Sequence, residues 1–316
     1  MLTIATFNLC NLGVDASPAR LARLARIIVH EMALPEILAV QEITAEAPIL
    51  HNGQVPATAT YQALIAAIMD AGGAQYTFRE IPPLVNQDGG MAGANIRVGL
   101  LFNPAHVKFP DRGNAGSQDN IDIAVNNGRI NLTLNPGRIY PIHPAFAGDP
   151  CHHWTPCRKM LAAEFEVGTQ QLFVINCHFK SMRSMARREE DYTKKQRHAQ
   201  AELVHHFASM LLRHNPETAI VLLGDINDVA SSKTLKLLKG ELFHNLLDDL
   251  PRSQSYTRRH SGQPQALDHI LVSPVLRRGA TVRIPHVNSD ITPGNPAPVS
   301  DHDPVVATLP ALAVCQ

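Results

Sequence analysis

Short apolar runs that end in polar or acidic side chains recur along this chain, and they constrain its fold more than any other feature. The clearest run is residues 219–225, in which five aliphatic residues precede Gly224 and Asp225. Similar runs cover residues 36–42 and 96–102. Uninterrupted runs of this length are typical of strands buried on both faces. The sequence therefore predicts central sheets that other elements cover.

The remaining elements follow from periodicity and capping signals. Further strands are expected at residues 2–9, 161–167, 172–177, 267–273 and 305–309. Helical spacing predicts helices at about 17–32, 60–72 and 199–213, the last after a charged segment at 183–197, and a short helix between Ser231 and Gly240. Strand-rich halves joined by helices predict an α/β (α+β) fold, a four-layer α-β-β-α sandwich with two packed mixed sheets and outer helices.

The 316 residues are expected to form a single domain spanning 1–316, because neither an internal repeat nor a linker is visible. Residues 103–157 form the one long stretch without clear periodicity, and they are rich in Asn, Gly and Pro. A loop of this length in a compact domain is usually functional or carries minor structure of its own. We interpret it as an irregular insertion.

Composition excludes some classes of protein. Lys and Arg number 28, as do Asp and Glu, so the net charge is zero with the histidines neutral. A protein that binds a polyanion mainly through charge usually has an excess of basic residues. Any polyanion-binding site on this chain must therefore be local. No stretch is apolar enough for a membrane span, and no signal peptide is visible. We therefore expect a cytoplasmic protein, and a monomer.

The strand ends carry an unusual set of polar side chains, and these side chains predict one shared pocket. They are Asn8, Glu42, His178, Asp225 with Asn227, Asp268 with His269, and Asp301 with His302. Each type is common alone, but their repeated placement where buried strands stop favours a common site. Taken singly, Asp225 and Asn227 fit an ordinary turn equally well, and His178 fits a core histidine.

The acids in this set suit divalent-metal chemistry on phosphate esters. Glu42, Asp225 and Asp301 offer hard oxygen ligands, which favour Mg²⁺ or Mn²⁺, with Ca²⁺ as an alternative, over Zn²⁺. Phosphodiester hydrolysis needs an aimed water, a stabiliser of the developing charge and a proton for the leaving group. Asp225 and Asn227 can hold the water, and His178 or His302, oriented by Asp268, can supply the charge or the proton.

Six short motifs, in order, resemble those of a known family. They are Thr-Phe-Asn-Leu at 6–9, Val-Gln-Glu at 40–42, Cys-His-Phe-Lys-Ser at 177–181, Gly-Asp-Ile-Asn at 224–227, Leu-Asp-His-Ile at 267–270 and Ser-Asp-His-Asp-Pro at 300–304. The series resembles the endonuclease/exonuclease/phosphatase superfamily, with its deoxyribonuclease I-like and exonuclease III-like nucleases, sphingomyelinases and inositol polyphosphate phosphatases. The resemblance spans nearly the whole chain.

The resemblance implies a role for each matching residue. Asn8 and Glu42 would hold the metal, with Asp301 nearby. Asp225 would activate or orient the water, Asn227 would bind phosphate, and His178 and His302 would have the acid and electrostatic roles. Phosphate contacts from Lys180 and Arg158 are also expected, although the local match at Arg158 is looser. Whether Asp268 pairs with His178 or His302 stays open.

The preferred function is hydrolysis of phosphodiester bonds in DNA or RNA, because the motif at 267–273 looks more like that of the nucleases. Small or lipid phosphoesters are the alternative substrates, as in inositol phosphatases or sphingomyelinases, and the neutral net charge mildly favours them. A noncatalytic binding module is a third interpretation, which the complete motif set disfavours. Sequence alone does not decide between endonuclease and exonuclease or between DNA and RNA.

Two further segments have open interpretations. Cys151, His152, His153 and Cys157 end the insertion, and they fit a zinc site, a disulfide or a plain loop, although their spacing matches no common zinc motif. The basic residues at 183–197 are interspersed with acids, which favours a solvated helix face over a phosphate-backbone contact.

Overall fold

Two six-stranded mixed sheets pack face to face in the computed structural model, which describes residues 1–46, 48–126, 128–140, 142–146, 154–183, 187–290 and 297–310. The first sheet has the order β15 (Thr281–Arg283), β16 (Val305–Leu309), β1 (Leu2–Leu12), β2 (Ile37–Ile43), β4 (Arg97–Phe102) and β3 (Thr77–Arg79). The second has the order β11 (His244–Asn245), β14 (Asp268–Val272), β10 (Ala219–Asp225), β9 (Gln170–His178), β8 (Leu161–Val167) and β7 (Gly137–Arg138).

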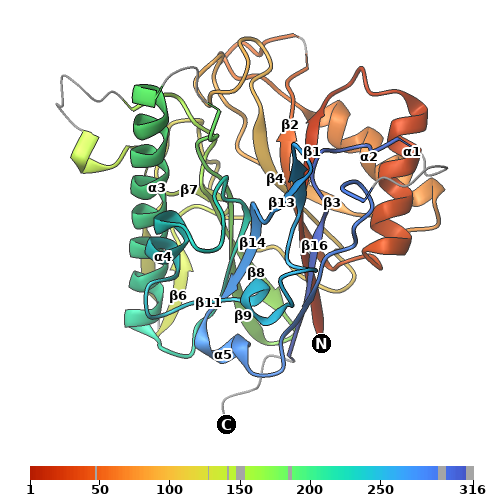
Figure 1. Cartoon of the computed structure of the whole chain (residues 1–316). Helices are drawn as coiled ribbons and strands as arrows, with labels where there is room; N and C mark the ends of the chain where they lie inside the picture. Colours follow the sequence, from red (N-terminus) through yellow and green to blue (C-terminus); the bar gives the residue numbers. More distant parts are fainter. Residues whose placement is uncertain are drawn as a thin grey trace.

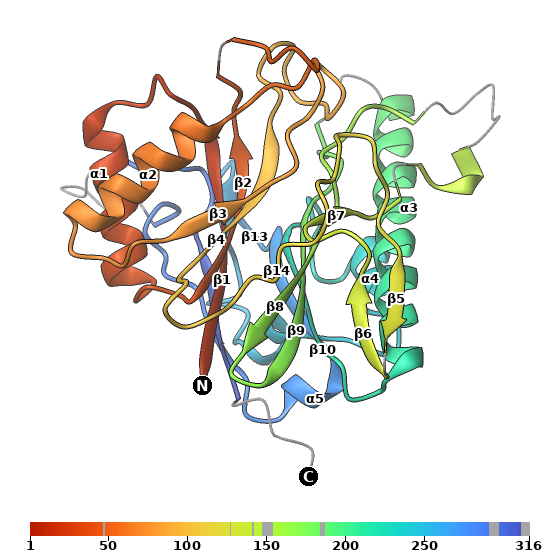
Figure 2. The same cartoon turned by 180° about the vertical axis from the view of Figure 1, so that it is seen from behind.

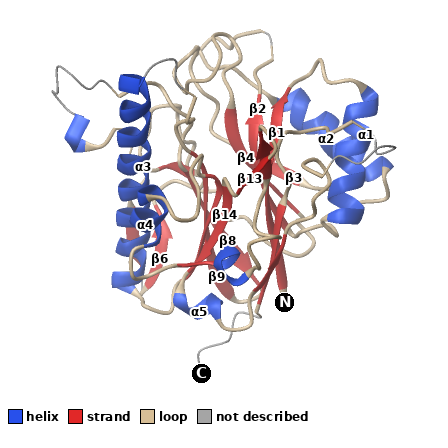
Figure 3. Ribbon diagram, viewed as in Figure 1, coloured by secondary structure: helices blue, strands red, loops and turns tan. Residues whose placement is uncertain are grey.

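Helices cover the outer face of each sheet (Figures 1 and 2). The first sheet is covered by α1 (Pro18–Arg26), which continues as a π-helical turn (Ile27–Glu31), and by α2 (Thr58–Asp70). The second is covered by α3 (Arg187–His214) and α4 (Lys233–Lys239). The ribbon coloured by secondary structure shows the sheets between these helical layers (Figure 3). The predicted four-layer α-β-β-α sandwich is therefore confirmed.

The central strands are mostly apolar because both of their faces are buried. In β10, Val221 and Leu223 pack between the sheets, whereas Ile220 and Leu222 pack against the helical layer of α3 and α4. In β1, Ile4 faces the other sheet and Phe7 faces α1 and α2. Burial of both faces explains why apolar residues form uninterrupted runs in the sequence instead of alternating with polar residues.

The short helix α4 illustrates how local capping sets an element's bounds. The Ser232 hydroxyl accepts a hydrogen bond from the Leu235 amide at 3.2 Å, and Gly240 ends the helix with φ of 50°. Both signals were readable in sequence. The predicted helix at 17–32 differs, because its α-helical part ends at Arg26 and a π-helical turn follows.

The stretch predicted as an irregular insertion contains regular structure. β5 (Ile123–Asn126) and β6 (Arg129–Leu132) form a hairpin, and β7 extends the second sheet by pairing with β8. These strands are two to four residues long, too short for a period-two pattern to emerge. A second small hairpin, β12 (Arg258–His260) with β13 (Gln263–Gln265), precedes β14. Short helical turns lie at Pro144–Phe146, Leu246–Asp249 and α5 (Pro274–Arg277).

Candidate active site

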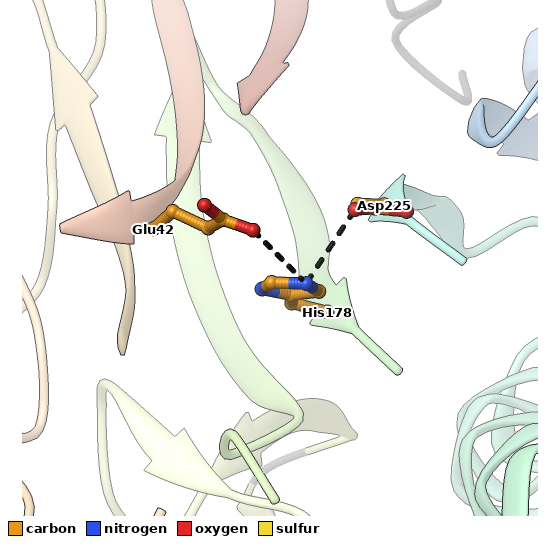
Figure 4. Close-up of side chains that lie close together, drawn as sticks. All are labelled: Glu42, His178 and Asp225. Atoms are coloured by element: carbon orange, nitrogen blue, oxygen red, sulfur yellow. Dashed lines mark ion pairs between the residues drawn. The ribbon is translucent and has the colours of Figure 1, made fainter. Parts of the chain in front are cut away.

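The carboxyl ends of four strands meet at one edge of the sandwich. β1 runs parallel to β2 in one sheet, and β9 runs parallel to β10 in the other. The amide Nδ2 of Asn8 lies 3.0 Å from Oδ2 of Asp225 and 3.3 Å from Oε1 of Glu42. Nε2 of His178 lies 3.4 Å from Oδ2 of Asp225 and 3.8 Å from Oε1 of Glu42 (Figure 4). The two sheets thus contribute to a single cluster.

Unusual backbone conformations place the acidic residues of the cluster. Glu42 has φ of 60°, at a point where the pairing of β2 with β4 shifts register. Its Oε2 accepts a hydrogen bond from the Asn11 amide at 3.1 Å. Gly224 has φ of 127°, and a Cβ there would lie 2.0 Å from the carbonyl oxygen of Cys177. Because only glycine fits, β9 and β10 can approach closely beside Asp225.

A histidine–aspartate pair lies beside the cluster. Nδ1 of His302 lies 2.6 Å from Oδ2 of Asp268, which also accepts a 2.6 Å hydrogen bond from the Thr257 hydroxyl. Nε2 of His302 is 4.0 Å from Oδ2 of Asp225. Asp268 therefore pairs with His302 and not with His178, which answers the question that the sequence left open. The pairing fixes the His302 ring with Nε2 toward Asp225.

Burial and neighbouring charges shift the pKa values of Asp225, His302 and His178 by different amounts and in different directions. Burial raises the pKa of Asp225 to about 7; His302 opposes this shift, and Asp268 and Glu42 add to it. Burial alone would lower the pKa of His302, but Asp268 and then Asp225 raise it to about 10. Burial, followed by the charges of Arg158 and His302, lowers the pKa of His178 well below its usual value. At neutral pH, His302 is a cation and His178 is neutral.

Asn227 and Arg158 converge on the backbone that follows His178. The Asn227 amide N–H donates to Oδ1 of Asp225 at 2.8 Å, and its side-chain Nδ2 donates to the carbonyl oxygen of Phe179 at 3.1 Å. Arg158 donates from Nη2 to the same carbonyl. Arg158 is 6% exposed, and its Nε has no hydrogen-bond partner among the described residues. Both side chains donate to the carbonyl of Phe179, and their phosphate contacts stay predictions.

Two predicted residues lie at the periphery of the cluster. Asp301 is half-exposed; its Oδ2 pairs with Nη2 of Arg258 at 3.1 Å, and its Oδ1 is 4.0 Å from Nε2 of His302. Lys180 is anchored through its backbone amide, which donates to Oε1 of Gln200 at 2.8 Å. Neither side chain belongs to the groups of described residues whose atoms converge as potential metal ligands.

The central cluster fits a divalent cation. Ligand atoms of Glu42, His178 and Asp225 lie within 4.8 Å of one another. Asn8 turns its side-chain Nδ2 toward Glu42 and Asp225, and its Oδ1 accepts from the Cys10 amide at 2.9 Å. Asp225, Asp268 and His302 form a second such group, but protonated His302 would repel a cation there. Carboxylate oxygens are donors that Mg²⁺, Mn²⁺ and Ca²⁺ prefer. The Glu42–Asp225 side therefore fits a cation better than the side of His302.

Several residues that position the site escaped the sequence reasoning. Asn176 donates from Nδ2 to the carbonyl oxygens of Val40 at 3.1 Å and Gly99 at 2.8 Å, and its Oδ1 accepts from Gln41 Nε2 at 2.8 Å. These bonds join the two sheets directly beneath the cluster. The Ser300 hydroxyl holds the carbonyl of Asn8 at 2.6 Å. A buried Gln or Asn inside an apolar run was the available signal.

Other polar residues have structural roles or lie outside the described part. His269 is buried, and its ring nitrogens contact the backbone oxygens of Asp228 and Ala266 and the amide of Asn245. Cys157 is a free, half-buried thiol. Cys151, His152 and His153 lie outside the described residues, so the zinc and disulfide interpretations stay predictions. Among the described helices, none is long and apolar enough to cross a membrane.

Comparison with known proteins places this geometry in a family. Truncated TDP2 from Caenorhabditis elegans superposes with a TM-score of 0.58 at 15% identity, over 98% of this chain and 97% of that chain. TDP2 from D. rerio, complexed with single strand DNA product, gives 0.54 at 15% identity, over 98% and 99%. A mannosyl-6-phosphatase from Bacteroides thetaiotaomicron gives 0.56 at 14% identity, over 98% and 99%. At these identities the likeness concerns the fold.

The sequence comparisons complete this placement. No curated protein matches the sequence at a significant level. The model of the Endonuclease/Exonuclease/phosphatase family matches residues 5–302, nearly the whole chain. This chain belongs to the Endonuclease/Exonuclease/phosphatase family, a family of enzymes that hydrolyse phosphoester bonds.

Proposed function

We propose that this protein is a metal-dependent nuclease that hydrolyses phosphodiester bonds of DNA or RNA by direct attack of an activated water. One observation carries the proposal: Asp225 lies between the metal-binding side chains Asn8 and Glu42 on one side and the His302–Asp268 pair on the other. This arrangement provides a base, a charge stabiliser and a cation site within one buried cluster.

Asp225 is suited to orient the water and accept its proton. Its Oδ1 is fixed by the amide of Asn227, while its Oδ2 faces Asn8 and both histidines. A pKa of about 7 lets the carboxylate exist near neutral pH and still accept a proton. Oδ2, which accepts from Nδ2 of Asn8 and lies near both histidines, would contact the water.

The two histidines are suited to the other steps of the reaction. His302 carries a positive charge at neutral pH, so its Nε2–H can stabilise the negative charge that develops on the phosphoryl oxygens. His178 is neutral and can donate a hydrogen bond from Nε2. Arg158, Asn227 and Lys180 would contact phosphate at the rim. Mg²⁺ or Mn²⁺ held by Asn8 and Glu42, with Asp301 nearby, would polarise the phosphoryl group and lower its barrier to attack.

The second candidate is hydrolysis of small or lipid phosphoesters with the same residues. The net charge of zero favours it, because nothing in the overall composition attracts a long polyanion. The fold is also shared with a protein described as a mannosyl-6-phosphatase. Both candidates need the same cluster, so they are separated by substrate.

The test compares polymer and small substrates under defined metals. Supercoiled plasmid and single-stranded oligonucleotides are incubated with Mg²⁺, Mn²⁺, Ca²⁺ or EDTA, using the wild type, Asp225→Ala and His302→Ala. Asp70→Ala and His214→Ala serve as matched controls, because both residues are exposed at helix ends. We expect metal-dependent cleavage that only the two site substitutions abolish. Intact nucleic acid together with metal-dependent phosphate release from small esters would replace the nuclease proposal with the second candidate.

A further inference from the structure

A pocket of about 400 Å³ lies beside the catalytic cluster, on the side of the insertion. Its lining combines aromatic and cationic side chains, including Tyr140, Trp154, Arg138 and Arg158. We propose that this pocket binds an unpaired nucleobase next to the scissile phosphate, so that the enzyme acts on single-stranded nucleic acid. This inference rests on the nuclease function proposed above and specifies its substrate.

The pocket is continuous with the end of strand β9, which carries His178. Arg158 lines the pocket and also donates to the carbonyl of Phe179, the residue after His178. Cys157, another lining residue, has its Sγ 3.9 Å from the carbonyl oxygen of His178. Gln200, a third lining residue, donates to Sγ of Cys157 at 3.3 Å and accepts from the Lys180 amide. Three residues of the pocket lining thus contact the backbone of residues 178–180.

Buried contacts hold the pocket walls in place. Nζ of Lys159 and Oδ2 of Asp88 lie 2.5 Å apart, and both residues are about 5% exposed. Gly89 packs so closely that a Cβ would lie 2.3 Å from the carbonyl oxygen of Pro156. The Gln54 side chain donates to the Ser117 hydroxyl at 3.1 Å, which holds a third wall. These walls are therefore preformed, so little ordering of them is needed on binding.

The lining chemistry matches a planar ring with polar edges. Trp154 is half-buried and contacts Phe146 edge-on, with ring centroids 5.2 Å apart and an interplanar angle of 87°. Tyr140 is 37% exposed. Aromatic rings of this kind stack on bases of any sequence. Arg138 and Arg158 also line the pocket, and guanidinium N–H groups can donate to the oxygen and nitrogen atoms at the edge of a base.

Pocket size then determines the form of the substrate. A volume of about 400 Å³ falls in the range of small-ligand sites and cannot admit a paired duplex. A base inside a duplex would first have to leave its stack, which costs free energy, whereas an unpaired base enters directly. A strand end or a single-stranded segment is therefore favoured over an intact duplex.

Trp154 is the only tryptophan in the chain, so its fluorescence reports directly on the pocket. Metal-free wild-type protein is titrated with the dinucleotide pTpT, and separately with ribose 5-phosphate, which carries phosphate but no base. We expect quenching and a shift of Trp154 emission with pTpT only. Equal responses to both ligands, or no response to pTpT at millimolar concentration, would overturn the base site.

Kinetics provide an independent readout. Trp154→Ala should raise KM for a single-stranded oligonucleotide by about ten-fold, with kcat less affected, and Trp154→Phe should restore most of the loss, because stacking on an aromatic ring is what binds the base. An unchanged KM in Trp154→Ala would contradict the proposal. The titration needs no turnover, so cleavage without base-dependent quenching rejects the pocket alone. Base-dependent quenching without cleavage of any polymer rejects the nuclease function instead.

Discussion

Two buried clusters of charged side chains in this protein balance their charges in opposite ways. In the candidate active-site cluster, the carboxylates of Glu42, Asp225 and Asp268 gather around two histidines, of which only His302 is charged at neutral pH. In the cluster beneath the insertion, each acid faces a strong base: Asp88 lies 2.5 Å from Lys159, and Glu80 lies 3.5 Å from Arg97.

The difference shows which cluster is built for an external partner. The cluster beneath the insertion neutralises its charges within the chain, so it joins two loops without any ligand. The candidate active-site cluster holds an excess of carboxylates in a buried place, and either a bound cation or a proton on Asp225 can compensate it. Substitutions in the two clusters, and metal binding, test this contrast.

The largest effect is expected from Asp225→Asn, which removes the proposed base while keeping its shape. Activity on the best substrate should fall on the order of 10³-fold, because an amide cannot accept the proton. Stability without metal should not fall, since one of several crowded carboxylates becomes neutral. Rate assays and urea unfolding of the same preparation measure both. Substantial loss of stability would show that Asp225 is a structural residue.

The cluster beneath the insertion should behave in the opposite way. Lys159→Met leaves Asp88 buried without its partner and should cost about 3–5 kcal/mol of unfolding free energy. The double variant Asp88→Leu with Lys159→Met should recover most of that loss, because no uncompensated charge remains. Urea unfolding of both single variants and the double variant measures the coupling. Equal stabilities of Lys159→Met and the wild type would refute the structural role of the pair.

Metal should stabilise the protein through the catalytic cluster only. At a Mg²⁺ or Mn²⁺ concentration of 100 times Kd, the gain is about 2.7 kcal/mol, read as a raised melting temperature. Glu42→Ala should abolish this response. Glu80→Gln is the matched control, because it changes a buried glutamate in the other cluster and should leave the response intact. If the Glu80→Gln variant lost the stabilisation by metal and the Glu42→Ala variant kept it, the metal site would have to be assigned to the other cluster.

The smallest effect is expected from Asp268→Asn, which should change the pKa of His302. Asp268→Asn removes the carboxylate that most strongly raises the pKa of His302, so this pKa should fall from about 10, and His302 should lose its charge at a lower pH. NMR titration of the metal-free protein follows the imidazole signals of His302 and His178 separately. His302 should shift while His178 stays neutral. An unchanged His302 pKa would mean that another group holds its charge.

Much of this architecture was predictable because its signals are local. The runs at β4, β8, β10 and β16 predicted strands within a residue or two, since double burial demands uninterrupted apolar side chains. The ends of α4 followed from Ser232 and Gly240. The strands β5, β6 and β7 were missed, because strands of two to four residues are too short to show a period-two pattern.

The candidate site was likewise predictable from the sequence only in part. The residue types at the strand ends indicated a common pocket, and the structure brings Asn8, Glu42, His178 and Asp225 into contact distance. Sequence did not predict that Asp301 would pair with Arg258, because that contact depends on the loop before β14. Nor did it predict the bridge from Asn176 to Val40 and Gly99 between the sheets.

The buried strands and the chemical groups at their ends could be predicted from the sequence, because hydrophobic period and residue type are properties of short segments. The pairing of Asp268 with His302, the crowding of carboxylates around Asp225, and the pocket between the insertion and residues 84–88 depend on the tertiary structure. Those outcomes depend on register and distance between residues far apart in the chain, and these are set when the two sheets pack.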